Sequence, residues 1–517
     1  MSLEAFGVRN LRCLTDTPLV PIRPITVLVG RNSSGKSTFL RAFPLLRQSV
    51  ETARNSPILW YRERNVDFGS LKDAANNRLS EPSVTFQFRL RLPKGAEIAI
   101  GDPTFDIAMT LAGGEVPYVS SYEIRVEGHE IHWVFDEHGQ VRSLTVNGEV
   151  VALKSPLFLG GKAHLLPTLQ PGVNTGVSYE DAPETFRLDY HTQADDVLLN
   201  PLAQELQTLF RENTVAVTMR DVAQTVRLGS PSSMLSQLPR LSNLKVYQQN
   251  VSVLDVENDQ FKAIANAALA RLSPYILEAA DLVLARFMSR VAYLAPLRVR
   301  PERAYRVQNL AVDDVDPDGE NLAMFLRSLT PAESASFATF TSNALGFQTS
   351  VRTTGHHAEI LVKSSKAKVF VNLVDVGFGY SEVLPLAALL WASCIRPTIE
   401  RREPTPLIAI EQPELHLHPA HQADLARMLV EAVTNGGGAR LLVETHSESL
   451  INGLGKLIYE GALKADDVQI VLFEQDEETE QTTVKLAGYR ENGALRDWPY
   501  GFLSPVATRR STSAAAE

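Results

Sequence analysis

Cysteine is scarce in this sequence, whose 517 residues include only Cys13 and Cys394. Two cysteines are too few for a disulfide framework, and neither has metal-ligand spacing, so we expect a reducing, cytoplasmic environment. No apolar run approaches about 18 residues, the length that a membrane-spanning helix needs, so we expect no membrane partner. The opening MSLEAFGVRN lacks the basic segment and apolar run of a secretory signal.

Positive charge is not in excess either. The chain carries 50 Lys and Arg against 60 Asp and Glu, which gives a net charge of -10. This balance excludes a polycation that coats nucleic acid, but a local basic groove stays possible because net charge does not report where the charges lie. Heptad patterns longer than a few turns are also missing, so we expect no long coiled-coil arms. We find no internal repeat, so the chain offers one set of motifs.

What the chain does have is a succession of patterns that predicts an α/β protein. Strand-like apolar runs alternate with helical periodicity near both ends, which indicates a parallel or mixed sheet. In between, alternating segments such as VTFQFRLRL, EIAI and SYEIRV predict antiparallel strands, and helical periodicity follows. We expect five regions: an α/β lobe (1–80), a β-rich region (81–160), a helical insertion (161–290), a second α/β lobe (291–475), and a C-terminal β segment with a tail (476–517).

The most specific motif is GRNSSGKS, which matches the phosphate-binding pattern G-x-x-x-x-G-K-[ST] between a predicted strand and a predicted helix. Its glycines let successive backbone N–H groups and the helix N-terminus face an anion. Lys36 would reach the β- and γ-phosphates, and the Ser37 hydroxyl would coordinate Mg²⁺. A chance glycine-rich loop is disfavoured by the flanking elements. The predicted nucleotide-binding residues here are Gly30, Arg31, Asn32, Ser33, Ser34, Gly35, Lys36, Ser37 and Thr38.

Two later strands also end in polar residues. PLIAIEQPELHLHP places Glu411 at the tip of a buried strand beside the phosphate loop, where an acidic residue can hold Mg²⁺. An ordinary strand with a solvated acidic end is the alternative. LLVETHSES ends a further strand at Thr445-His446, and His446 could contact the γ-phosphate or the attacking water. A lone histidine is more often structural, but the order of the three motifs favours function.

In this order, the motifs resemble the ABC-type ATPases of the SMC, RecF and OLD group. Further segments resemble stand-alone bacterial AAA-type ATPases, including the PtuA-like ATPases of Septu and of some retron anti-phage systems. The resemblance covers roughly 1–75 and 290–505, and implies an ABC-ATPase-like P-loop fold that uses ATP and Mg²⁺. The segments that carry it are NVDFGS (Asn65–Ser70), YLAPLRVRPERAY (Tyr293–Tyr305), DVGFGYSEVLPL (Asp375–Leu386), EQPELHLHP, and RDWPYGF (Arg496–Phe502).

The resemblance also implies a signature segment. GFGYSEV, from Gly377 to Val383, stands where this group contacts the γ-phosphate held by the other subunit. Gly377 and Gly379 would permit close backbone approach, and the Ser381 hydroxyl with the helix N-terminus could meet phosphate. The sequence of this segment departs from the usual LSGGQ signature. A turn before a core helix is the alternative interpretation. A shared site of this kind implies a homodimer or a higher oligomer.

The catalytic acid departs from the family pattern Asp-Glu-Pro. The aligned residues are Glu411, Gln412 and Pro413, and an amide cannot take a proton from water. Gln412 can therefore position the nucleophile, while Glu414 is the nearest carboxylate that could act as its base. We expect slow hydrolysis and a long-lived ATP-bound dimer. The predicted catalytic residues are Glu411, Gln412, Glu414 and His446, and the predicted Mg²⁺ ligands are Ser37 and Glu411.

Three other features of the sequence are less specific for a function. His416, His418 and His421 could gather around a metal, but His418 aligns with a loop that crosses the dimer interface in the resembling group. The basic run of Arg298, Arg300, Arg303 and Arg306 is equally well a phosphate- or DNA-facing groove or a solvated loop. The acidic run DEETE, Asp476–Glu480, is typical of a hairpin turn.

OLD-type relatives carry a C-terminal nuclease domain, for which too little chain follows His446. The resemblance therefore implies a homodimeric ATP switch that controls a separate nuclease subunit in anti-phage defence, with DNA as a candidate partner. One alternative is an ATPase of the RecF type that acts on DNA in repair or replication. Another is a nucleotide-dependent assembly scaffold.

Overall fold

The computed structural model describes residues 2–52, 54, 56–63, 65–91, 104–160, 164–171, 194–211, 216–308, 312, 314–396, 407–435, 438–476, 479 and 481–498. The predicted strand EIAI, the end of RDWPYGF and the C-terminal tail lie wholly or partly outside these residues. The chain divides into two compact units: Met1–Pro21 with Arg41–Val291, and Ile22–Leu40 with Ala292–Glu517. Among the described residues, no helix is long and apolar enough to cross a membrane.

The second unit is built on a sheet with a parallel centre. Its strands follow the order β21 (Thr482–Tyr489), β20 (Val468–Gln475), β4 (Ile25–Gly30), β19 (Arg440–Glu444), β18 (Leu407–Glu411) and β13 (Val291–Leu294). Strands β20, β4, β19 and β18 run parallel, and β21 pairs with β20 antiparallel. Every residue of β4 and β18 is buried, as continuous apolar runs in a covered parallel sheet require.

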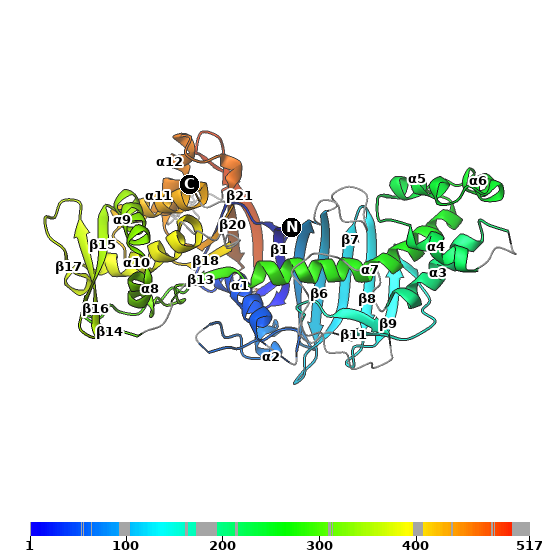
Figure 1. Ribbon diagram of the computed structural model, residues 1–517, viewed down its shortest axis with the longest axis horizontal. Helices are drawn as coiled ribbons and strands as arrows, with labels where there is room; N and C mark the ends of the chain where they lie inside the picture. Colours follow the sequence, from blue (N-terminus) through cyan, green and yellow to red (C-terminus); the bar gives the residue numbers. More distant parts are fainter. Residues whose placement is uncertain are drawn as a thin grey trace, which may run out of the picture. The chain divides into compact units, whose positions relative to one another are not determined.

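Helices complete the core of this unit. It is formed by residues of the sheet together with α8 (Leu322–Ser328), α9 (Pro331–Leu345), α10 (Phe378–Leu390), α11 (Pro419–Asn435) and α12 (Glu448–Tyr459). The fully buried Trp391 follows α10, and its ring meets Phe325 of α8 and Phe337 of α9 edge to face. A small separate sheet holds β14 (Tyr305–Arg306), β15 (Phe347–Thr354), β16 (His357–Ser364) and β17 (Val371–Asn372) (Figure 1).

The first unit is an antiparallel sheet with helices. It runs in the order β10 (Glu149–Val150), β9 (Val141–Val146), β8 (His129–Phe135), β7 (Tyr118–Val126), β6 (Thr104–Ala112), β5 (Ser83–Arg91), β1 (Ser2–Leu11) and β2 (Leu14–Asp16), with β3 (Val20–Pro21) paired to β1. Alternate residues of β8 are buried, which is the pattern of a sheet packed on one face. The 30-residue helix α7 (Asp259–Met288) lies across this sheet (Figure 1) and contacts β1, β8 and β9.

The predicted helical insertion contains more than helices. Helices α3 (Asp195–Gln207), α4 (Ala216–Gln224), α5 (Pro231–Leu241), α6 (Lys245–Val251) and α7 form its larger part. Its beginning instead contains β12 (Thr168–Pro171), which pairs antiparallel with β11 (Leu157–Gly160). The predicted α/β class is confirmed.

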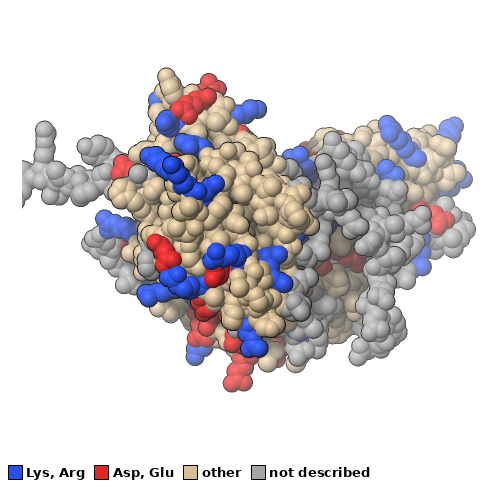
Figure 2. Space-filling view, turned by 60° about the vertical axis from the view of Figure 1, so that its left-hand side comes forward, with Lys and Arg blue, Asp and Glu red and all other residues tan. Residues whose placement is uncertain are grey.

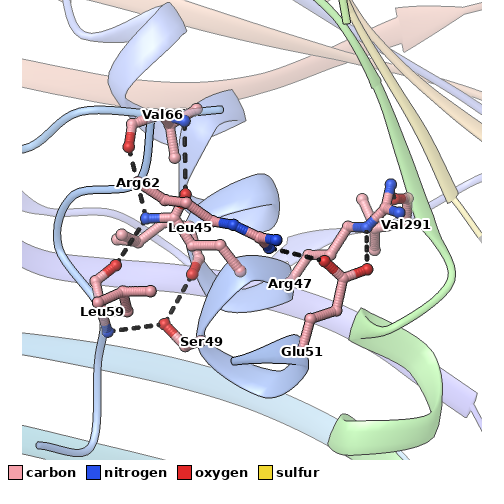
Figure 3. Close-up of polar contacts among 9 residues, drawn as sticks. Leu45, Arg47, Ser49, Glu51, Leu59, Arg62, Val66 and Val291 are labelled. Carbon is pink, nitrogen blue, oxygen red and sulfur yellow. Dashed lines mark hydrogen bonds and ion pairs between the residues drawn. The ribbon is translucent and has the colours of Figure 1, made fainter. Parts of the chain in front are cut away.

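Helix α1 (Lys36–Glu51) is anchored by polar contacts along its second half (Figure 3). The Gln48 amide nitrogen donates to the Leu59 carbonyl over 2.6 Å, and the Ser49 hydroxyl accepts from the Leu59 N–H over 2.9 Å. Arg62 pairs with Glu51 over 3.1 Å. Gln48 also meets the backbone of Val66, which lies in the NVDFGS segment. This segment therefore braces the helix that begins at the phosphate loop.

Candidate nucleotide site

The phosphate loop links β4 to α1 through a backbone that needs glycine at two points. A Cβ on Gly30 would lie 2.5 Å from the Phe473 carbonyl oxygen on β20, so no larger residue fits without a shift. Gly35 has a φ of 93°, in the left-handed region that favours glycine. Ser33 also has a positive φ, of 64°. The loop thus brings its backbone round to the start of α1 at Lys36, as an anion-binding helix N-terminus requires.

Within this loop, Lys36 turns back over the chain. Its Nζ donates to the Arg31 carbonyl over 2.6 Å, and the Ser34 hydroxyl donates to the same carbonyl over 2.8 Å. Lys36 and Thr38 are buried, whereas Arg31 and Asn32 are exposed. The arrangement holds the lysine charge inside the curve of the loop, where phosphate oxygens would approach.

Strand β19 lies between β4 and β18, the strand that ends at Glu411. Glu411 ends β18 and stands directly opposite Glu444, the last residue of β19. Glu411 Oε1 accepts a hydrogen bond from the Tyr293 hydroxyl over 2.7 Å.

Glu444 is the residue that sequence reasoning missed. The Ser37 hydroxyl donates to Glu444 Oε1 over 2.9 Å, although 407 positions separate the two residues. Glu444 is only 2% exposed. In the sequence, Glu444 is recognisable as a carboxylate at the end of the apolar run LLVE, directly before Thr445-His446.

Glu414 and His446 meet through the main chain. Glu414 Oε1 accepts the His446 N–H over 2.6 Å. Burial raises the pKa of the Glu414 carboxyl, against the opposing effects of this hydrogen bond and of the Arg298 charge. The His446 side chain is exposed, and its pKa is lowered by partial burial and by the charge of Lys36. The lowered pKa of His446 favours the neutral imidazole.

Gln412 occupies an unusual backbone conformation. Its φ is 40°, which is rare for a residue with a side chain, and its N–H donates to the Glu444 carbonyl over 2.9 Å. The chain thus pairs with β19 for one residue beyond β18 and then turns sharply. Such outliers persist only where the surroundings impose them, and they cluster at functional sites.

The signature segment begins α10, with Gly377 as the N-terminal cap residue. Gly377 has a φ of -59°, and a Cβ there would meet nothing within 4 Å. A Cβ on Gly379 would touch only Leu417, at an ordinary 3.5 Å. Ser381 is 8% exposed. Neither backbone conformation nor packing within the described residues requires glycine at 377.

The histidines after β18 do not form a metal cluster. His416 and His418 are exposed, and His421 lies 3.6 Å from Asp424. Within the ranges that the structure describes, no group of three His, Cys, Asp or Glu side chains could hold a metal ion. Mg²⁺ in nucleotide sites instead needs one or two protein oxygens beside the phosphates, and the Ser37 hydroxyl with the Glu444 carboxylate fits that donor set.

Two arginines of the basic run, Arg298 and Arg303, differ in burial. The Arg298 side chain is 1% exposed and lies 3.5 Å from Glu382, so for this residue neither the groove nor the solvated loop is correct. Arg303 is exposed and pairs with Asp375. On the face in Figure 2, the described Lys and Arg residues gather in separate groups with Asp and Glu among them.

Part of the chain is similar to a known protein family. Residues 1–110 and 320–451 match a protein-family model described as an AAA ATPase domain. The matched segments include the phosphate loop, the signature segment, Glu411 and Glu444. The expected ABC-ATPase-like α/β fold is confirmed. No curated protein matches the chain.

Solved structures with similarity to this chain include SMC head domains. The SMC head domain from Thermotoga maritima shares 10% identity at a TM-score of 0.36, over 94% of this chain and 98% of that one. The Smc head domain with a coiled coil and joint from Pyrococcus yayanosii shares 12% identity at a TM-score of 0.34, over 95% and 98%. TM-scores this low do not establish a common arrangement of whole chains.

Proposed function

We propose that this ATPase binds ATP with Mg²⁺ at Gly30–Ser37, hydrolyses it slowly, and acts as a homodimeric switch. The contact between Ser37 and Glu444 carries the proposal, because it joins the phosphate loop to the polar end of a distant strand. Beside it, Lys36 lies within the curve of the loop, and His446 is close enough for their charges to interact. These are the groups that phosphate binding and phosphoryl transfer require.

The metal chemistry follows from the oxygen donors. Mg²⁺, when bound, would neutralise charge on the phosphate oxygens. Ser37 and Glu444 would hold it, and Glu411 lies opposite Glu444 on the next strand with its orientation fixed by Tyr293. We therefore extend the predicted pair of Mg²⁺ ligands, Ser37 and Glu411, by Glu444.

Slow turnover is supported by the residue after Glu411. Gln412 can donate and accept hydrogen bonds but cannot remove a proton from water. Glu414, two residues on, is the next carboxylate after Gln412 and has a raised pKa, which favours proton acceptance. Its Oε1 is engaged with the His446 N–H, so only part of the carboxylate is available. Such an enzyme would remain in the ATP-bound state for long periods.

Dimerisation is supported by the signature segment. Gly377 is exposed at the start of α10 and has open space around it. Close approach of nucleotide held by a second copy would explain the glycine. The resemblance to Septu- and retron-associated ATPases further suggests control of a separate nuclease in anti-phage defence, with DNA as a candidate partner. A RecF-like role on DNA and a scaffold role are the alternatives.

The direct test measures phosphate release and mass with ATP and Mg²⁺. We expect slow release, a dimer with ATP, and loss of both in Lys36→Ala. Fast release that Glu414→Gln leaves unchanged would contradict the slow-switch proposal. A nuclease that co-purifies at fixed stoichiometry from the native locus supports the effector role. A dimer alone favours the RecF-like role, and ATP-driven oligomers indifferent to DNA favour the scaffold.

A further inference from the structure

A glutamine on α11 bridges two loops of the candidate site. Gln422 lies in the first turn of α11 and is half-buried. Its Nε2 donates to the Leu417 carbonyl over 3.0 Å, and its Oε1 accepts from the Ser447 hydroxyl over 2.7 Å. Leu417 belongs to the loop that follows β18, and Ser447 belongs to the turn that follows β19. One side chain thus connects the segments that follow two neighbouring strands.

The donor and acceptor roles in this bridge are fixed by chemistry. A main-chain carbonyl can only accept, so the amide nitrogen of Gln422 faces Leu417 and the amide oxygen faces Ser447. The Ser447 hydroxyl therefore donates its single hydrogen to Gln422, while its oxygen accepts the Leu450 N–H over 3.0 Å. That bond caps the N-terminus of α12. The chain of hydrogen bonds thus runs from the loop after β18 to the start of α12.

The turn after β19 is also tied to the strand that leads into the phosphate loop. The Thr445 N–H donates to the Leu28 carbonyl of β4 over 3.1 Å. The Ser447 N–H donates to the Thr445 hydroxyl over 2.9 Å. His446 lies between these two residues, so the main chain on either side of it is held by hydrogen bonds.

The loop after β18 has a backbone that needs support. Gln412 and His416 both have positive φ, of 40° and 63°, which residues with a side chain rarely adopt. Such conformations persist only where the surroundings impose them. The hydrogen bonds to Glu444 and His446 hold the first half of the loop. The bond from Gln422 holds its far end, at the buried Leu417.

We propose that Gln422 is a positioning residue that holds the turn of His446 and the loop of Gln412 and Glu414 in one arrangement. The inference rests on the proposed ATPase function and adds a residue outside the predicted catalytic and nucleotide-binding sets. Gln422 acts through the main chain of Leu417 and the hydroxyl of Ser447. Without the bridge, the two segments lose their common anchor, so hydrolysis slows while nucleotide binding at the phosphate loop persists.

The test compares Gln422→Leu with Gln469→Leu. Gln469 lies in β20 of the same unit, is also half-buried, and donates to the carbonyls of Ile470 and Ala487 over 2.9 and 2.7 Å, so it is the matched control. We expect Gln422→Leu to lower kcat about tenfold or more and to change the KM for ATP less than about threefold. Hydrogen exchange of a peptide spanning residues 441–450 should accelerate. Gln469→Leu should change neither.

A double-mutant cycle tests whether the bridge acts as one unit. Ser447→Ala removes the hydroxyl that donates to Gln422. We expect the kcat of Gln422→Leu/Ser447→Ala to be no lower than that of the slower single variant, because both substitutions break the same bridge. Additive losses of kcat would overturn the proposal, as would equal losses in Gln422→Leu and Gln469→Leu.

Two further measurements keep the outcome decisive. If Gln422→Leu does not fold, Gln422→Glu replaces it, because glutamate still accepts from Ser447 but cannot donate to Leu417. The same loss of kcat is expected, and a wild-type kcat would contradict the bridge. If the wild type releases no phosphate, the proposed function fails. Faster exchange of residues 441–450 in the Gln422 variant then still supports the positioning role, and unchanged exchange rejects it.

Discussion

At the residue scale, a single amide sets the expected chemistry of the site. Gln412 has a positive φ and is tied by its N–H to Glu444, so its backbone is held whatever its side chain. Glutamate has nearly the same shape as glutamine and differs mainly in its ability to accept a proton. A Gln412→Glu substitution therefore changes the ability of this side chain to accept a proton while it leaves the geometry of the site nearly unchanged.

We expect Gln412→Glu to hydrolyse ATP faster, by about tenfold or more, because general base catalysis typically contributes 10²–10⁴-fold. Phosphate release under saturating ATP measures the effect, with Gln412→Ala as the control that removes the side chain. An unchanged rate in Gln412→Glu would show that deprotonation at this position does not limit turnover.

Glu444 supports a second residue-scale prediction. If its carboxylate holds Mg²⁺ with Ser37, Glu444→Gln should weaken Mg²⁺-dependent ATP binding more than ATP binding in EDTA. Gln preserves the shape and the acceptor oxygen, so a folding defect is not expected to explain the loss. Titration of a fluorescent ATP analogue with and without Mg²⁺ distinguishes the cases. Equal loss under both conditions would assign Glu444 to loop structure alone.

At the scale of elements, the sequence predicted strands, helices and motif positions well, but not which strands are neighbours. Buried apolar runs around Val27, Ile410 and Val443 identified three parallel strands, because their pattern is local. The order of strands depends on contacts between distant segments. The contact between Ser37 and Glu444, and the burial of Arg298 within an apparently basic run, were for this reason not predictable from local pattern.

Helix α7 carries a cluster with a pH dependence. Asp281 accepts from the Leu166 N–H over 2.8 Å and pairs with His164, which raises the pKa of His164. Burial raises the pKa of Glu278 to about 7 from an ordinary 4.5. Both folded-state values are raised, so both groups stabilise at low pH and lose that contribution as pH rises. The window runs from 4.5 to about 7 for Glu278 and continues above 6.5 for His164.

We therefore expect thermal stability to fall between pH 5 and pH 8, and Glu278→Gln to reduce that fall by removing one of the two titrations. A shift of a few degrees in Tm is the expected scale for such a group. Thermal unfolding by circular dichroism at a series of pH values gives the comparison. Parallel pH profiles for the two proteins would contradict the assignment to Glu278.

At the scale of the whole molecule, we expect a complete nucleotide site to need two copies of the chain, one for the phosphate loop and one for the signature segment. Lys36→Ala disables the loop and leaves the signature segment intact, whereas Gly377→Trp fills the open space at the start of α10 and leaves the loop intact. If each site joins the loop of one copy to the signature of the other, a mixed dimer of these variants contains one site with both parts intact. Each variant alone contains none.

We expect each variant alone to be inactive, and an equal mixture to recover about a quarter of wild-type phosphate release, because half the dimers are mixed and each has one sound site. The mixture should also recover an ATP-dependent dimer by native mass measurement. Mixing either variant with itself at doubled concentration controls for mass action. If the mixture forms no dimer and releases no phosphate, the shared site is excluded, and the exposed glycine of α10 must serve a contact other than a second copy of this chain.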